Sequence, residues 1–126
     1  MGQTRVLSRC DLAREMHKLG VLKQELPVWV CIARYESKYN TSAIGRLNGN
    51  WSNDFGIFQI SDRFWCVSSP NRTSLNLCAV DCKLLLSDDI RESVRCAQTV
   101  KKLQGWKAWA VYRACNRILP NVNECF

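Results

Sequence analysis

The spacing of apolar residues along the chain predicts a helix over about residues 8–20. Ser8 and Asp11 form a capping-box pattern before the apolar residues, and Gly20 follows the last of them. The apolar side chains recur at i, i+4 and i+7, which places them on one helical face: Leu12, Met16 and Leu19.

A second apolar stripe predicts a helix that begins near Pro27, a residue suited to the first helical turn. Trp29, Ile32 and Ala33 continue this stripe, and Glu36 occupies its next position. A carboxylate therefore occupies the last position of a helical face that is otherwise apolar.

The pattern changes from about residue 40 onward. Asn48-Gly49 is a strong hairpin signal, and residues 55–60 are β-branched and aromatic, which predicts a strand. Residues 62–86 are rich in loop-forming residues. We expect Ser87–Asp89 to cap a third helix that Gly105 ends, and a fourth helix over about 107–116. Helices on both sides of a small antiparallel sheet indicate an α+β fold.

Composition narrows the class of protein. The chain has 126 residues, about the length of one domain, and 47% of them are hydrophobic, which excludes intrinsic disorder. No apolar run approaches the length of a membrane-spanning helix. The formal net charge is +7, so anionic partners are favoured.

Eight cysteines spread along the chain predict four disulfides and an oxidising compartment. A zinc site would need clustered ligands, and the one close pair is Cys78 and Cys82, with no cysteine near His17. The chain begins without an export signal, so we expect that a signal has been removed. Spacing alone leaves 105 possible pairings for eight cysteines.

Elimination leaves carboxylates as the candidate catalytic groups. His17 is the single histidine, and the sequence has no G-x-S-x-G, Gly-rich phosphate loop or H-E-x-x-H motif. Most of the eleven acids fall at helix starts, on helix exteriors or in polar loops, Asp62 among the last. Glu36 and Asp54 lack such an explanation.

Two carboxyls in different environments are what glycoside hydrolysis requires. Burial among apolar residues would raise the pKa of Glu36 and let it donate a proton. Ser52 and Asn53 could supply hydrogen bonds that keep Asp54 ionised. On the residues alone, a buried ion-paired glutamate and an ordinary turn aspartate remain the alternative.

Two segments, residues 33–41 (ARYESKYNT) and 52–60 (SNDFGIFQI), resemble the active-site segments of the c-type lysozymes. The resemblance extends over nearly the whole chain, and all eight cysteines occupy family positions. Residues 25–27, 104–106 and 123–126 are most similar to insect members. The family is itself the type case of the paired-carboxylate mechanism, which is therefore carried over from it.

The resemblance implies one domain over 1–126, with a helical lobe (about 1–40 and 87–126), a β lobe (about 41–86) and the active-site cleft between them. It implies that Glu36 is the general acid and Asp54 the nucleophile or electrostatic stabiliser of a retaining reaction. The bond cut would be the β-1,4 link from N-acetylmuramate to N-acetylglucosamine in peptidoglycan. The implied disulfides are Cys10–Cys125, Cys31–Cys115, Cys66–Cys82 and Cys78–Cys96.

The resemblance also places several residues in the sugar-binding cleft. Trp109 matches a tryptophan that packs near the acid, and Trp65 with Phe64 matches an aromatic wall. The remaining cleft positions are Gln59, Ser61, Ala108 and Arg113. Several residues depart from the common family pattern, among them Phe55 and Phe64 where a hydroxyl or indole is frequent, Ser61 where many relatives have Asn, and Trp51 where a small residue is usual.

Functions other than hydrolysis are also compatible with parts of the sequence. Some family members bind calcium, but residues 87–93 (SDDIRES) lack the acid cluster that calcium needs, so we expect no metal and no cofactor. A sugar-binding relative that does not cut, or a cationic membrane-active protein, is the alternative to an enzyme. The basic residues are scattered without a recognition motif, which argues against nucleic-acid binding. We therefore expect a secreted monomer that acts on peptidoglycan at anionic bacterial surfaces, without stable membrane insertion, in defence rather than digestion.

Overall fold

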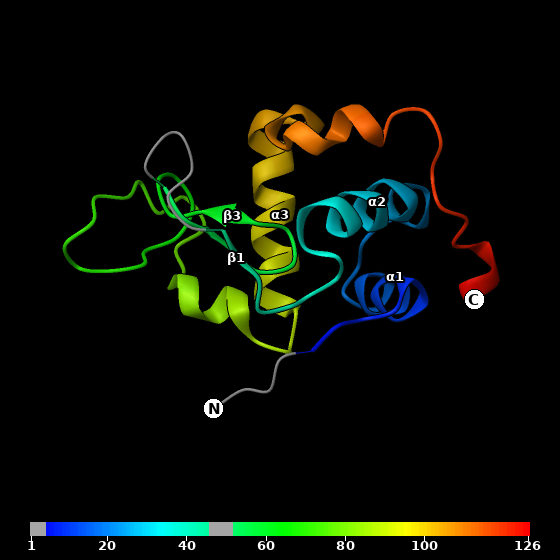
Figure 1. The fold of residues 1–126 in the computed structure, drawn as a ribbon, viewed down its shortest axis with the longest axis horizontal. Helices are drawn as coiled ribbons and strands as arrows, with labels where there is room; N and C mark the ends of the chain where they lie inside the picture. Colours follow the sequence, from blue (N-terminus) through cyan, green and yellow to red (C-terminus); the bar gives the residue numbers. More distant parts are fainter. Residues whose placement is uncertain (1–4, 46–51) are drawn as a thin grey trace.

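The computed structural model describes residues 5–45 and 52–126. Three α-helices, α1 (Arg9–Lys18), α2 (Leu26–Ser37) and α3 (Arg91–Gln104), surround the buried core, and a small sheet lies beside α3 (Figure 1). This α+β arrangement confirms the fold class. The Asn48-Gly49 hairpin signal lies outside the described residues. Within the described residues, no helix is both long and apolar enough to cross a membrane.

The start of α1 agrees with the sequence pattern. Ser8 is the N-cap residue, its Oγ accepts a hydrogen bond from Asp11 N at 3.0 Å, and Asp11 completes the capping box. Pro27 lies in the first turn of α2, as predicted. The apolar stripe of α2 is buried, because Trp29 and Ile32 have no exposed surface.

The sheet has three antiparallel strands in the order β1 (Ile44–Gly45), β2 (Asp54–Phe55) and β3 (Ile60–Ser61). The prediction of one strand over residues 55–60 is wrong, because the chain turns back within this segment and Phe55 pairs with Ile60. Gly56 and Gln59 take positive φ values of 82° and 51° in the turn, which a continuous strand would not allow. The two apolar side chains in this turn, Ile57 and Phe58, are buried in the core.

The predicted fourth helix is also different in the structure. Residues 106–114 form two short 3₁₀ helices, η3 (Trp106–Ala108) and η4 (Ala110–Ala114), on either side of Trp109. Trp109 is extended, and its indole is buried with Nε1 donating to Phe58 O at 3.0 Å. A continuous α-helix would not place Trp109 in this conformation.

The segment before α3 caps that helix only in part, because Asp89 accepts a hydrogen bond from the N–H of its first residue, Arg91, but is not the N-cap residue. Ile90 is its N-cap and offers no side-chain cap. Ser87 and Asp89 instead accept hydrogen bonds from backbone N–H groups two residues ahead, which forms consecutive turns. Gly105 ends α3, as predicted.

Four disulfides join distant parts of the chain, and they are the same pairs that the resemblance implies: Cys10–Cys125, Cys31–Cys115, Cys66–Cys82 and Cys78–Cys96. The bridge from Cys78 to Cys96 fastens the outer loop, residues 63–81 after β3, to α3. The bridge from Cys31 to Cys115 fastens α2 to the segment after η4.

Gly56 sits where no side chain fits, which yields a stability prediction. A Cβ at this position would lie 2.1 Å from the carbonyl oxygen of Leu85, and φ is +82°. We expect Gly56→Ala to lower the free energy of unfolding by about 3 kcal/mol, from steric overlap and backbone strain together. Thermal unfolding measures this change.

Gly20→Ala is the matched control, because Gly20 also has a positive φ (+95°) but no atom within 4 Å of a built Cβ. We expect it to cost about 1 kcal/mol, from strain alone. Equal losses in the two variants would show that the contact with Leu85 does not restrict Gly56.

Candidate active site

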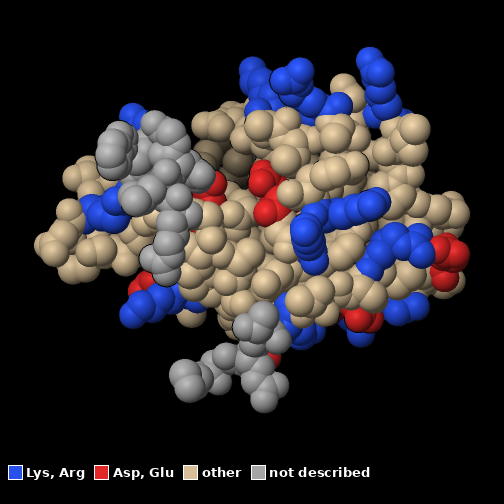
Figure 2. Space-filling model, viewed as in Figure 1, with Lys and Arg blue, Asp and Glu red and all other residues tan. Residues whose placement is uncertain are grey.

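A cleft of about 350 Å³ lies between the helices and the sheet. Figure 2 shows a hollow in the upper centre of this face with acidic side chains at its border. Eight of the nine residues proposed from the sequence for catalysis and sugar binding line this one cleft: Glu36, Asp54, Gln59, Ser61, Phe64, Trp65, Ala108 and Trp109. The structure thus brings together residues that are up to 73 positions apart in the sequence.

Glu36 lies in the last turn of α2, and its position is fixed through its neighbour Ser37. Ser37 Oγ lies 2.8 Å from Ile57 O and 3.0 Å from Ala33 O, within hydrogen-bonding distance of both. The end of α2 is therefore tied directly to the turn between β2 and β3. Glu36 is partly buried at this junction.

The environment of Glu36 raises its pKa from 4.5 to about 7. Burial is the larger cause, because an ionised carboxylate loses hydration there, and the negative charge of Asp54 acts in the same direction. Near neutral pH, Glu36 consequently keeps its proton in a substantial fraction of molecules, as a general acid must.

Aromatic rings form the apolar side of this environment. Trp109 lines the cleft and is 5% exposed. Trp29 packs edge to face against Trp109, Trp106 and Phe58, with ring centroids 5.3, 4.7 and 5.4 Å apart. These contacts, together with the hydrogen bond to Phe58 O, hold the Trp109 indole in place at the edge of the cleft.

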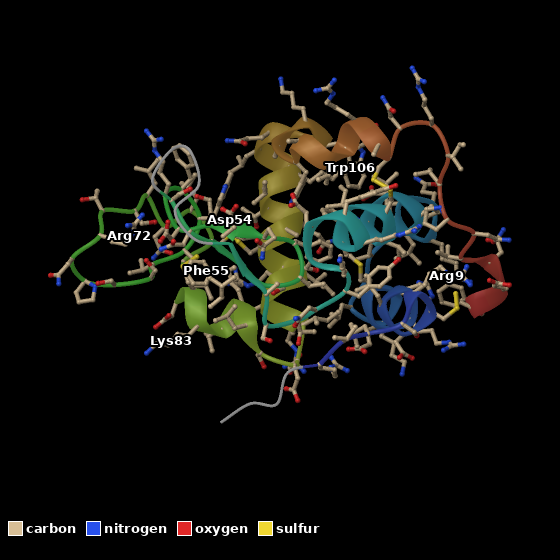
Figure 3. The ribbon with its side chains drawn as sticks, in the orientation of Figure 1. Arg9, Asp54, Phe55, Arg72, Lys83 and Trp106 are labelled. Carbon is tan, nitrogen blue, oxygen red and sulfur yellow. A yellow bond between two sulfur atoms is a disulfide. The ribbon has the colours of Figure 1, made fainter. Side chains whose placement is uncertain are left out.

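Asp54 begins β2, opposite Ser61 of β3 and Gly45 of β1. Figure 3 shows Asp54 and Phe55 on the sheet between the outer loop and α3. Asp54 is partly exposed, in contrast to the buried residues that follow Phe55. The two carboxyls thus enter the cleft from different elements and different surroundings.

The side chain of Gln59, a polar residue of the cleft, is held by hydrogen bonds to backbone carbonyl groups. Gln59 Nε2 donates to Gly56 O at 2.9 Å and to Ala43 O at 3.1 Å. Its oxygen faces Gly45, where a built Cβ would approach it to 2.7 Å. The absence of a side chain at Gly45 therefore allows this close packing of the Gln59 amide.

Asp62 has a structural role that sequence reasoning missed. Its side chain has no exposed surface, although the sequence suggested a polar loop acid. It accepts from Asn53 N at 3.1 Å and Ser68 Oγ at 2.8 Å, and it forms an ion pair with Arg72 at 3.0 Å. Arg72 comes from the outer loop in Figure 3, so Asp62 fastens this loop to the residue before Asp54. The 10-residue spacing from Asp62 to Arg72 gives no recognisable motif.

The structure changes the set of cleft residues in two respects. Four further residues line the cleft and were not expected there: Ile60, Val100, Gln104 and Ala110. Arg113, in contrast, lines a different hollow and is not among the residues around Glu36. The described part of the chain contains no group of three or more His, Cys, Asp or Glu residues that could hold a metal ion.

A carboxyl of raised pKa and a second carboxyl in one aromatic-walled cleft are features that glycoside-cleaving proteins share. The comparisons with known proteins agree with this class. The C-type lysozyme/alpha-lactalbumin family model matches residues 5–125. Lysozyme 1 of Musca domestica is 51% identical over all of this chain and 88% of its own length, and Lysozyme P of Drosophila melanogaster is 48% identical over 98% and 88%.

A solved structure gives the same result for the fold. The crystal structure of recombinant canine milk lysozyme in its apo form has a TM-score of 0.81, 36% identity and 90% coverage of both chains. This chain therefore belongs to the C-type lysozyme/alpha-lactalbumin family. The relatives support glycoside hydrolase activity of the lysozyme type.

Proposed function

We propose that this chain hydrolyses the β-1,4 link from N-acetylmuramate to N-acetylglucosamine in peptidoglycan, with retention at the anomeric carbon. The observation that carries the proposal is the raised pKa of Glu36, about 7, in the same cleft as Asp54. In this mechanism Glu36 holds the proton, and Asp54 holds the negative charge.

In the first step, Glu36 donates its proton to the glycosidic oxygen as the bond to the leaving sugar breaks. Asp54 attacks or stabilises the positively charged anomeric carbon. Glu36, now ionised, then removes a proton from water as the oxygen of that water bonds to the anomeric carbon, and a bond that Asp54 has formed to this carbon breaks at the same time. Glu36 is thereby protonated again and Asp54 is again a carboxylate, so the cycle is complete.

The remaining cleft residues bind the sugar chain in this proposal. The rings of Trp65 and Phe64 offer apolar surfaces on which sugar rings stack. Gln59, Ser61 and the backbone of Ala108 are placed to exchange hydrogen bonds with hydroxyl and acetamido groups. Phe64 lacks a polar ring atom, so it contributes stacking without a hydrogen bond.

We further propose that the chain is secreted and acts as a monomer in defence against bacteria. Four disulfides are typical of proteins in oxidising compartments. The +7 charge attracts the enzyme to anionic cell walls over a range that salt shortens.

Product analysis tests the proposed bond and stereochemistry. We expect the chain to clear a suspension of peptidoglycan and to release fragments with N-acetylmuramate at the new reducing end, initially as the β-anomer by NMR. Reducing ends of N-acetylglucosamine, or an initial α-anomer, would contradict the proposal. Binding without any clearing would support the sugar-binding alternative.

A further inference from the structure

A second hollow, of about 440 Å³, lies outside the cleft, between α2 and the segment after α3. We call it the arginine hollow after Arg34, Arg113 and Arg117, which line it together with Tyr35 and Ile118. Its two walls are joined covalently, because Cys31 of α2 is bridged to Cys115. The two backbone segments that carry the three arginines are therefore held together.

The arginines of this hollow differ from the others in their partners. Ten arginines lie in the described residues, and six of them form ion pairs with Asp or Glu: Arg5, Arg9, Arg14, Arg72, Arg91 and Arg95. Of the four described arginines without such a pair, three line the arginine hollow, and no acidic residue lines it. Like charges gathered without a counter-charge repel one another, so a bound anion would relieve an electrostatic cost.

The cations continue beyond this one hollow. Arg34 and Tyr35 also line a neighbouring hollow with Lys38 and Tyr39. Figure 2 shows Lys and Arg side chains along the upper edge of this face, over the segment that is orange in Figure 1 and that carries Arg113 and Arg117. Two adjoining hollows that share Arg34 fit a ligand whose negative charges repeat along a chain better than a single small ion.

We propose that the arginine hollow binds the phosphate groups of a linear polyanion of the poly(glycerol phosphate) type. Guanidinium groups recognise phosphate through paired N–H donors, and each repeat of this polymer carries one phosphodiester. Tyr35 and the exposed Ile118 offer apolar surface to the carbon atoms between phosphates. The site is separate from Glu36 and Asp54, so the proposal does not rest on the proposed hydrolysis.

Binding of poly(glycerol phosphate) to charge-matched variants tests the proposal by isothermal titration calorimetry. The double variant Arg34→Gln/Arg117→Gln removes two charges from the hollow. The control Lys18→Gln/Lys83→Gln removes two exposed charges elsewhere. We expect the affinity to fall about tenfold or more in the first and about twofold or less in the second. Unchanged thermal midpoints verify folding in both.

Three outcomes would overturn binding of the polymer in the arginine hollow. Equal losses in the two double variants would indicate diffuse charge attraction over the whole surface. Full binding by Arg34→Lys/Arg117→Lys would contradict recognition through paired guanidinium donors, and we expect partial binding instead. If the variant Arg34→Gln/Arg117→Gln lost binding to phosphatidylglycerol vesicles but still bound the polymer fully, the arginine hollow would be assigned to a lipid surface.

Discussion

Glu36→Gln is expected to lower the rate of peptidoglycan clearing by a factor of about 10²–10⁴, the usual contribution of a general acid. Glutamine preserves the size of the side chain and its place in the last turn of α2, but it has no acidic proton to donate. Glu92→Gln is the control, because Glu92 lies on α3, outside the cleft, and pairs with Arg95. It should clear at the wild-type rate.

Thermal unfolding at pH 8 distinguishes lost chemistry from lost structure. The pKa of Glu36 is higher in the folded chain, about 7, than its ordinary 4.5, so its contribution to stability decreases as pH rises between these values. Glu36→Gln is free of this loss and should be at least as stable as the wild type at pH 8. A variant that is stable and still clears at the wild-type rate would contradict the role of Glu36.

Asp54→Asn is expected to lower the rate of clearing by about 10²-fold or more, because the neutral amide cannot stabilise positive charge at the anomeric carbon. The same variant should lower the pKa of Glu36, since the charge of Asp54 is one of its two causes. The pKa should stay above 4.5, because burial is the larger cause. Clearing rates and a pH titration of the variant measure both effects.

Asp89→Asn is the control for Asp54→Asn. Asp89 is exposed before α3, and its side chain accepts from Arg91 N, a bond that asparagine can also form. We expect wild-type clearing and an unchanged pKa of Glu36. An Asp54→Asn variant with wild-type clearing would rule out Asp54 as nucleophile or stabiliser.

The two N-terminal helices could be predicted because their signals are local. Ser8 and Asp11 cap α1 within one turn, and Pro27 fits the first turn of α2. The apolar stripe of α2 also led to Glu36, since a carboxylate on a buried face needs either a partner or a function. Local chemistry of this kind requires no knowledge of the remaining fold.

The misread segments depend on contacts with distant parts of the chain. Residues 55–60 have the composition of a strand, but Gly56 is packed against Leu85 O and turns the chain back. The helix expected near 107–116 is divided because Trp109 is extended and bonded to Phe58 O, 51 residues away. Tertiary contacts override local preference at both places.

The functional site was predicted only in part, because some of its contacts also join distant parts of the chain. Resemblance to the family supplied the cleft positions, and the fold brings eight of those nine residues to one place. The buried Asp62 was missed because its partner Arg72 lies in a loop without periodic pattern. Arg113 was expected in the cleft but lines the arginine hollow, since η4 directs this part of the chain along α2.

The proposed mechanism depends above all on a protonated Glu36, which a ¹³C NMR titration of its carboxyl group in the wild-type protein measures directly. We predict a pKa of about 7, with activity decreasing as pH rises through the same range because the acid loses its proton. A pKa near the ordinary 4.5, or activity that stays constant to about pH 9 while Glu36 is ionised, would contradict the mechanism.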